Sequence, residues 1–167
     1  MNLPQALLVF VVMAPGAVFI ALALLWLLGW VPSERVLSRT TGLTFAASLL
    51  ALVWMLATAR AAAVTGTFGN WFAVHEYRFP LVLAADHLSL PFLAMTVVLS
   101  GLIGKFSATY LHRESGFFRF FALLHLFAFG SLLAVEAGSF DLLIAGWGLL
   151  GVTSVLLIAF FEQRPPP

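Results

Sequence analysis

The sequence predicts an all-α integral membrane protein with about five transmembrane helices and a short β-hairpin between the second and the third. Hydrophobic residues fill 62% of the 167 positions and charged residues only 9%, more apolar surface than a soluble core of this size can bury. The apolar residues form runs of about 20, enough to cross roughly 30 Å of hydrocarbon. The chain is predicted to be a single membrane domain, residues 1–167, with helices at about 6–31, 42–64, 88–107, 117–135 and 140–161.

The first apolar run, residues 6–31, is too long for a signal-peptide core and has neither a preceding positive side chain nor a clear small-residue cleavage site. It is therefore predicted to be a retained membrane helix. Pro15 and Gly16 interrupt it, and the missing proline N–H predicts a bend here in preference to a break. A polar turn at 32–41 separates this helix from the one at 42–64, whose small residues favour close helix contact.

Composition changes at 67–85, where glycine, asparagine and aromatic residues replace the aliphatic run. Short strands at 68–74 and 79–84 are predicted to form a hairpin on the membrane surface. His75 and Glu76 would lie at its tip. Two such residues without a third ligand are a weak metal signal, so a solvated turn is the favoured interpretation and no metal site is predicted.

Basic residues predict how the chain is oriented in the membrane. One side would hold Arg60 and Arg78 and the other side the remaining six of the eight basic residues. The more basic side should be cytoplasmic. This predicts a multi-pass protein of the bacterial inner membrane, with its N-terminus and hairpin outside and its C-terminus inside. The six residues are Arg35, Arg39, Lys105, Arg113, Arg119 and Arg164.

Several function classes lack support in the composition. The chain has no cysteine, which excludes disulfides and thiolate chemistry. Its net charge of +1 is dispersed, so nucleic-acid binding is not predicted. Spaced motifs for a Ser–His–carboxylate set or a phosphate-binding loop are absent from the sequence. The chain is therefore not predicted to be an enzyme on its own.

Ionisable residues within the predicted helices are the functional candidates, because charge inside hydrocarbon is costly. His125 lies about eight residues into helix 117–135, roughly 12 Å from its cytoplasmic end. Imidazole titrates near neutral pH, so His125 is a candidate proton relay. A neutral histidine that bonds a neighbouring helix would explain this position equally well.

Lys105 is the second relay candidate, near the inner end of helix 88–107. Its long side chain can reach the membrane surface, and this structural interpretation is favoured over a relay. Glu136 and Asp141 are expected at the outer boundary of the membrane, where their charges are solvated. These expectations leave His125 and Lys105 as the proton-handling candidates.

Several short motifs occur in a fixed order over about 80 residues. They are Asp86-His87-Leu88-Ser89-Leu90, Phe106-Ser107, Tyr110-Leu111, Arg119-Phe120-Phe121-Ala122-Leu123, Gly146-Trp147 with Gly151 and Ser154, Leu156-Leu157-Ile158 and Glu162-Gln163-Arg164-Pro165. Together these motifs resemble the N-terminal part of the antiporter-like membrane subunits. That family includes the largest proton-pumping subunit of respiratory complex I, the large subunit of multi-subunit sodium/proton antiporters and the membrane partner of inorganic-carbon uptake systems.

The sequence departs from this family at two points. The family has a proton-handling glutamate directly after the Gly-Trp pair, and Gly148 occupies that position here. Family members also continue into further helices, one of which carries a central lysine, beyond the length of this chain. Neither the glutamate nor that lysine is available in this sequence.

The resemblance implies a shortened or split antiporter-like subunit of a proton- or sodium-translocating complex, possessing no redox cofactor of its own. Other polytopic membrane subunits would be its partners, in a complex of the NADH–quinone oxidoreductase kind. The alternatives are a non-conducting structural or assembly subunit and a truncated gene product. Gly148 favours the non-conducting alternative, because glycine binds no proton.

Overall fold

The computed structural model describes residues 2–59, 63–75 and 77–161. Within them lie five long helices and a two-stranded antiparallel hairpin between the second and third, which confirms the predicted fold class. A short 3-10 turn, Ala159–Phe161, follows the last helix. The elements are α1 (Leu3–Leu27), α2 (Glu34–Ala59), β1 (Val64–Val74), β2 (Tyr77–Ala85), α3 (Ser89–Tyr110), α4 (Phe117–Val135) and α5 (Phe140–Ile158).

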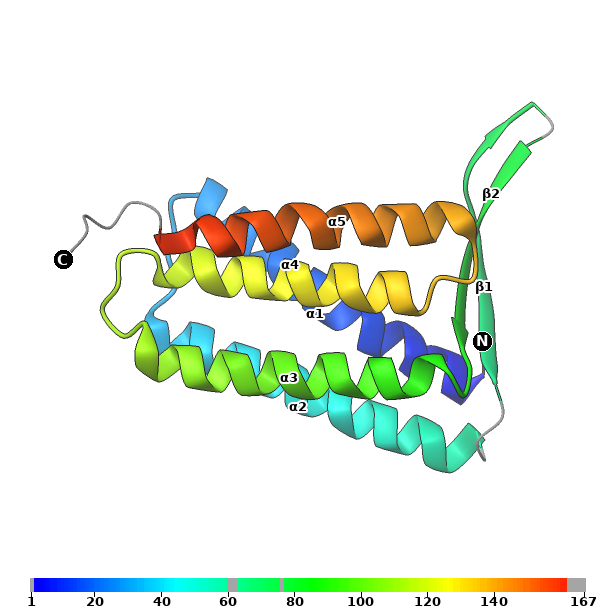
Figure 1. Cartoon of the computed structure of the whole chain (residues 1–167), viewed down its shortest axis with the longest axis horizontal. Helices are drawn as coiled ribbons and strands as arrows, with labels where there is room; N and C mark the ends of the chain where they lie inside the picture. Colours follow the sequence, from blue (N-terminus) through cyan, green and yellow to red (C-terminus); the bar gives the residue numbers. More distant parts are fainter. Residues whose placement is uncertain (1, 60–62, 76, 162–167) are drawn as a thin grey trace.

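Helix α4 lies at the centre of the bundle and contacts α1, α2, α3 and α5 (Figure 1). The N-terminus, the hairpin and the α4–α5 turn lie together at one end of the bundle, here called the hairpin end. The α1–α2 and α3–α4 connections lie at the opposite end, called the loop end. The helices therefore alternate in direction, as consecutive membrane spans do.

Helix α2 begins at Glu34, so the predicted start at residue 42 is wrong. Its first two turns are rich in polar residues, but Leu37 and Thr41 point inward and are buried. A glutamate in the first turn also interacts favourably with the helix dipole. The predicted end at residue 64 is wrong as well, because Val64 begins β1; residues 60–62 lie outside the described residues.

Helix α1 continues through Pro15, as predicted. The predicted end of the last helix at residue 161 is three residues too late, since α5 stops at Ile158 and the 3-10 turn follows. The hairpin strands are longer than predicted and pair from Val64 with Ala85 to Val74 with Tyr77. Glu76 of the predicted tip lies outside the described residues.

Strand β2 also pairs with the turn between α4 and α5. The Ala84 N–H donates to the Glu136 carbonyl at 2.9 Å, and the Gly138 N–H donates to the Val82 carbonyl at 2.8 Å. A β-bridge joins Leu83 to Ala137, which lies between Glu136 and Gly138. The hairpin is thus fastened to the last two helices as well as to its sequence neighbours.

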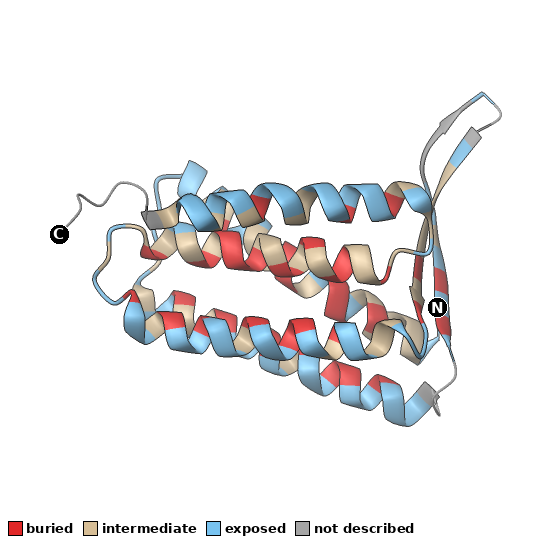
Figure 2. Ribbon diagram, in the orientation of Figure 1, coloured by how far each residue is buried: buried red, intermediate tan, exposed pale blue. Residues whose placement is uncertain are grey.

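Buried residues lie on the helix faces that turn toward one another, whereas the outer faces are exposed (Figure 2). Large apolar side chains cover those outer faces, for example Trp54 on α2, Phe106 on α3 and Trp147 on α5. Lipid is the solvent that such a surface requires. Together with the length and hydropathy of the five helices, this surface identifies a multi-pass membrane protein.

Helices α4 and α5 approach at two glycines. A Cβ added to Gly146 would lie 2.5 Å from the Ala134 backbone nitrogen, and one added to Gly130 would lie 2.9 Å from the Leu150 nitrogen. The helix backbones therefore touch, which is a common mode of packing in membranes. Gly101 and Gly104 of α3 pack against α2, whereas a Cβ at Gly151 would have no neighbouring heavy atom within 4 Å among the described residues.

Candidate functional site

His125 lies in the interior of the bundle, fully buried between α4 and α2. Its Nε2 is 3.1 Å from the Thr41 hydroxyl, and its ring stacks on Phe45 with centroids 5.4 Å apart. The Thr41 hydroxyl can donate to the Leu37 carbonyl at 2.9 Å. When it does so, it accepts from Nε2–H, which leaves the Nδ1 lone pair of a neutral ring open.

The open Nδ1 atom has no hydrogen-bond partner within the described part of the chain. A neutral imidazole in this tautomer can accept a proton at Nδ1 and release one from Nε2 toward Thr41. The hydroxyl can then pass a proton on by rotating. His125 and Thr41 therefore have the geometry of a two-member proton relay.

Gly104 makes the contact between α2 and α3 possible at this level. A Cβ at Gly104 would lie 2.7 Å from the Thr41 Cγ2 and 3.4 Å from a Leu124 methyl carbon. Any side chain there would push Thr41 away from its present position. The small residue is thus a positioning element for the histidine contact.

Replacing Gly104 by alanine is expected to destabilise the protein by about 1–3 kcal/mol through overpacking against Thr41. Unfolding by SDS in mixed micelles measures the change. Gly42→Ala is the matched control, since no described heavy atom lies within 4 Å of a Cβ at Gly42. Equal stability of the two variants would contradict the packing argument.

Further polar side chains are buried along the helices that surround His125. The Thr96 and Ser131 hydroxyls are 3.4 Å apart between α3 and α4. Buried hydroxyls also lie along α2 and α3, and the Ser48 Oγ is without a hydrogen-bond partner in the described chain. A row of polar groups, here called the polar row, therefore follows the bundle from the loop end toward the hairpin end: Ser107, Thr41, His125, Ser100, Ser48, Thr96 and Ser131.

Lys105 is not part of the polar row. It is exposed and lines a groove of about 310 Å³ on the outer surface between α2 and α3. Ser38 and Phe45 line the same groove. The structure thus separates Lys105 from His125, and the position suits the interpretation in which the lysine reaches for the membrane surface.

Gly148 lies on the exposed face of α5. No heavy atom of the described residues is within 4 Å of a Cβ built there. A longer side chain at this position would extend away from the bundle and not toward His125. Helix α5 is also less buried than α4, with 17% of its apolar span inside the protein compared with 39%.

Glu136, expected at the solvated outer boundary, is fully buried, and that expectation is wrong. Neither carboxylate oxygen has a hydrogen bond of normal geometry to a described residue. The pKa of Glu136 is raised to about 7, chiefly by burial; the Ser89 hydroxyl opposes this shift and the Asp86 charge adds to it. Local sequence gives no signal for this burial, because the hairpin strand that covers Glu136 is about 50 residues away.

Asp86 caps the first turn of α3. Its Oδ1 accepts from the backbone N–H groups of Leu88 and Ser89 at 2.9 and 2.8 Å, and the Ser89 hydroxyl accepts from the Asp86 N–H at 2.9 Å. These hydrogen bonds, above all the one from the Ser89 backbone, lower the pKa of Asp86. The Asp-His-Leu-Ser motif is thus a helix cap whose carboxylate stays charged at neutral pH.

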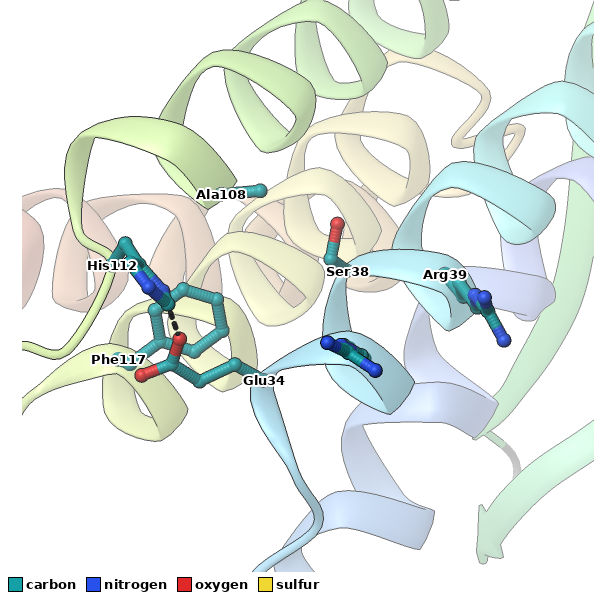
Figure 3. A pocket seen from close by; sticks show the side chains of 7 residues that line it. Glu34, Ser38, Arg39, Ala108, His112 and Phe117 are labelled. Atoms are coloured by element: carbon teal, nitrogen blue, oxygen red, sulfur yellow. Dashed lines mark hydrogen bonds and ion pairs between the residues drawn. The ribbon is translucent and has the colours of Figure 1, made fainter.

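An open pocket of about 240 Å³ lies at the loop end (Figure 3). Glu34 and His112 face each other there, with Oε2 and Nδ1 2.6 Å apart, while Arg39 extends away from them. The Arg113 N–H donates to the other Glu34 oxygen, Oε1, at 3.0 Å. Arg113 itself has a φ of +67°, and this hydrogen bond helps to fix that backbone conformation. Since His112 is largely exposed, this contact orders the α3–α4 loop and adds little stability.

A metal site is not formed in the part of the chain that the structure describes, where no three His, Cys, Asp or Glu side chains cluster. Fold and site together define a polytopic membrane protein with buried polar groups along three of its helices, two pairs of which are in contact.

The family described as NADH-Ubiquinone oxidoreductase (complex I), chain 5 N-terminus, matches residues 71–121. NADH-quinone oxidoreductase subunit L of Buchnera aphidicola is 36% identical over 94 residues, 56% of this chain and 15% of that protein. Subunit L of Escherichia coli is 33% identical over 96 residues, 58% of this chain and 16% of its own length. NADH-ubiquinone oxidoreductase chain 5 of Mammuthus primigenius is 32% identical over 95 residues, 57% and 16% respectively.

These matches confirm the resemblance to the N-terminal part of the antiporter-like membrane subunits. The aligned region covers about one sixth of the length of these relatives. The matched family segment runs from the end of β1 through β2 and α3 to the start of α4. It ends four residues before His125.

Proposed function

We propose that this chain is an antiporter-like membrane subunit of a proton- or sodium-translocating complex of the NADH–quinone oxidoreductase type. In this proposal the chain is a shortened or split subunit, and other polytopic subunits supply the remaining helices. The proposed location is the bacterial inner membrane. The observation that carries the proposal is the polar row around His125, in a chain similar to the N-terminal region of complex I chain 5.

The proposed orientation places the hairpin end outside and the loop end in the cytoplasm. Arg35, Arg39, Arg113 and Arg119 lie near the loop end, and a basic cytoplasmic side is usual in membrane proteins. The proposed proton path would then connect the cytoplasm with the outer face and would run between α2, α3 and α4. His125 is its proposed central relay, and Lys105 belongs to the surface.

Replacing His125 by glutamine is expected to lower proton flux by at least about tenfold, because the amide neither accepts nor releases a proton at neutral pH. The tagged chain would be purified in mild detergent with whatever membrane proteins accompany it, and these would be identified by mass spectrometry. The preparation would be reconstituted into liposomes. Flux would be followed with an internal pH dye under an imposed pH gradient.

Thr41→Val separates the relay from general packing. It removes the hydroxyl next to Nε2 and is expected to lower flux several-fold. Thr153→Val is the matched control, because Thr153 is equally buried but donates to carbonyls of its own helix α5. Equal flux in the parent and His125→Gln preparations would overturn the relay role, whereas loss of flux in Thr153→Val would point to a packing effect.

A non-conducting structural subunit is the second candidate. Gly148, on the exposed face of α5, favours it, because the proton-binding glutamate expected there from the family resemblance is missing. That role predicts recovery of a stable complex with partner subunits and no proton flux in the parent preparation. Flux that depends on His125 decides between the two functions.

A further inference from the structure

The buried carboxyl group of Glu136 lies outside the proposed relay of His125 and Thr41. It lies at the C-terminal end of α4, where the helix dipole disfavours a negative charge. Strand β2 pairs with the backbone of Glu136, where the Ala84 N–H donates to the Glu136 carbonyl at 2.9 Å. Its side-chain oxygens are fully enclosed and lack hydrogen bonds of normal geometry within the described chain. A buried, unpaired carboxylate is costly, so the neutral acid is the form that suits this site.

Two groups connect this carboxyl to the aqueous surface. Ser89, half-buried in the first turn of α3, has its hydroxyl near Glu136, and the same hydroxyl is hydrogen-bonded to the Asp86 backbone. Asp86 is exposed, and its negative charge contributes to the raised pKa of Glu136. His87, also exposed, is the neighbouring ionisable side chain that interacts with Asp86. A buried carboxyl, a half-buried hydroxyl and a surface carboxylate therefore follow one another at the hairpin end.

We infer that Glu136 is a proton-binding site at the hairpin end and that it is loaded from the surface through Ser89 and Asp86. Its use as an entry or exit point rests on the proposed function. In the transfer, the Asp86 carboxylate takes up a proton from surface water and passes it to the Ser89 hydroxyl oxygen, while the hydroxyl gives its own proton to the Glu136 carboxylate. Asp86 and Ser89 then both end as they began. One O–H bond is broken and one formed at each step, and no electrons are exchanged.

Further buried hydroxyls continue inward from this site. Ser131 lies five residues before Glu136 on α4, about 8 Å deeper along the helix, next to Thr96. His125 lies about 9 Å deeper again. Glu136 thus stands at the outer end of the polar row, whereas Gly148 faces away from the bundle. The chain has a carboxyl group on its internal path at a position different from that of the family glutamate.

Infrared spectroscopy of the purified chain with its accompanying subunits tests the site directly, because a protonated carboxyl has its own C=O band. The parent protein is expected to lose one such band as the pH rises through about 7. Glu136→Gln should remove this titration, and Asp141→Asn, which changes an acid in the first turn of α5, should retain it. A band unchanged in Glu136→Gln would overturn the site.

Asp86→Asn tests the same carboxyl without altering it. Removing the neighbouring negative charge is expected to shift the midpoint of the band to lower pH. An unshifted midpoint would overturn the coupling between the two carboxyl groups. This variant changes an exposed residue and serves even if Glu136→Gln fails to fold.

Proton flux separates this inference from the proposed function. Glu136→Gln is expected to lower flux by at least about tenfold in the liposome assay. Flux that falls in His125→Gln and not in Glu136→Gln would support the relay and overturn the loading role. A Glu136 band that titrates in a preparation showing no His125-dependent flux would leave the proton-binding site standing while the proposed transport function fails.

Discussion

Replacing Gly146 by valine is expected to abolish the folded α4–α5 pair and leave little stable protein. A Cβ at this position would lie 2.5 Å from the Ala134 nitrogen and 3.0 Å from the Gly130 carbonyl oxygen. Both atoms belong to the backbone of α4, so no side-chain rotation can relieve the overlap. The helices would have to separate, and α4 carries His125 and contacts four other helices. The yield of monodisperse protein in detergent and its resistance to SDS measure the effect.

Gly148→Val is the matched control on the same helix. Its Cβ would meet no described heavy atom within 4 Å, so stability is expected to stay within about 1 kcal/mol of the parent. Normal yield and stability of Gly146→Val would contradict the close backbone contact. Equal loss in both variants would instead indicate a general intolerance of β-branched residues in α5.

Stability of the purified protein is expected to fall as the pH rises from about 5 to 8. The pKa of Glu136 is about 7 in the folded protein and ordinarily 4.5, so the folded state binds the extra proton between these values. The stability that this proton gives is fully present below pH 4.5 and is lost as the pH passes through 7, which corresponds to roughly 3 kcal/mol. Free energies of SDS unfolding across this range would show the decline.

Glu136→Gln is expected to flatten this dependence, because its amide does not titrate. Asp141→Asn should preserve it and so control for a charge change near the same turn. The lowered pKa of Asp86 acts in the opposite direction, but only below about 3.8, outside the measured range. The same decline in the parent and in Glu136→Gln would show that another group causes it.

The helices were predictable because membrane insertion needs only local information. Runs of apolar residues of the required length gave all five spans, and His125 stood out as a polar side chain in one of them. The start of α2 was missed because charged residues can continue a helix beyond the hydrocarbon region. Hydropathy marks the part of a helix in lipid and not its full length.

The contacts between helices could not be predicted from the sequence. Thr41 and His125 are separated by 84 residues, and neither carries a local mark of the other. Glu136 follows an apolar helix in the usual place of a solvated boundary residue, and its burial depends on β2 folding over it. Likewise, nothing in the local sequence marks Ala134 as the neighbour of Gly146 or Thr41 as the neighbour of Gly104.

The pairing of β2 with residues 136–138 constrains how this protein is made. Translation delivers the hairpin before the α4–α5 turn that pairs with it, so the edge of β2 that faces this turn stays unpaired while α3 and α4 are synthesised. The pairing at the hairpin end can form only after the helix that ends at Val135 has crossed the membrane. Biogenesis of this end therefore finishes late, and Glu136 loses contact with bulk water at that closing step.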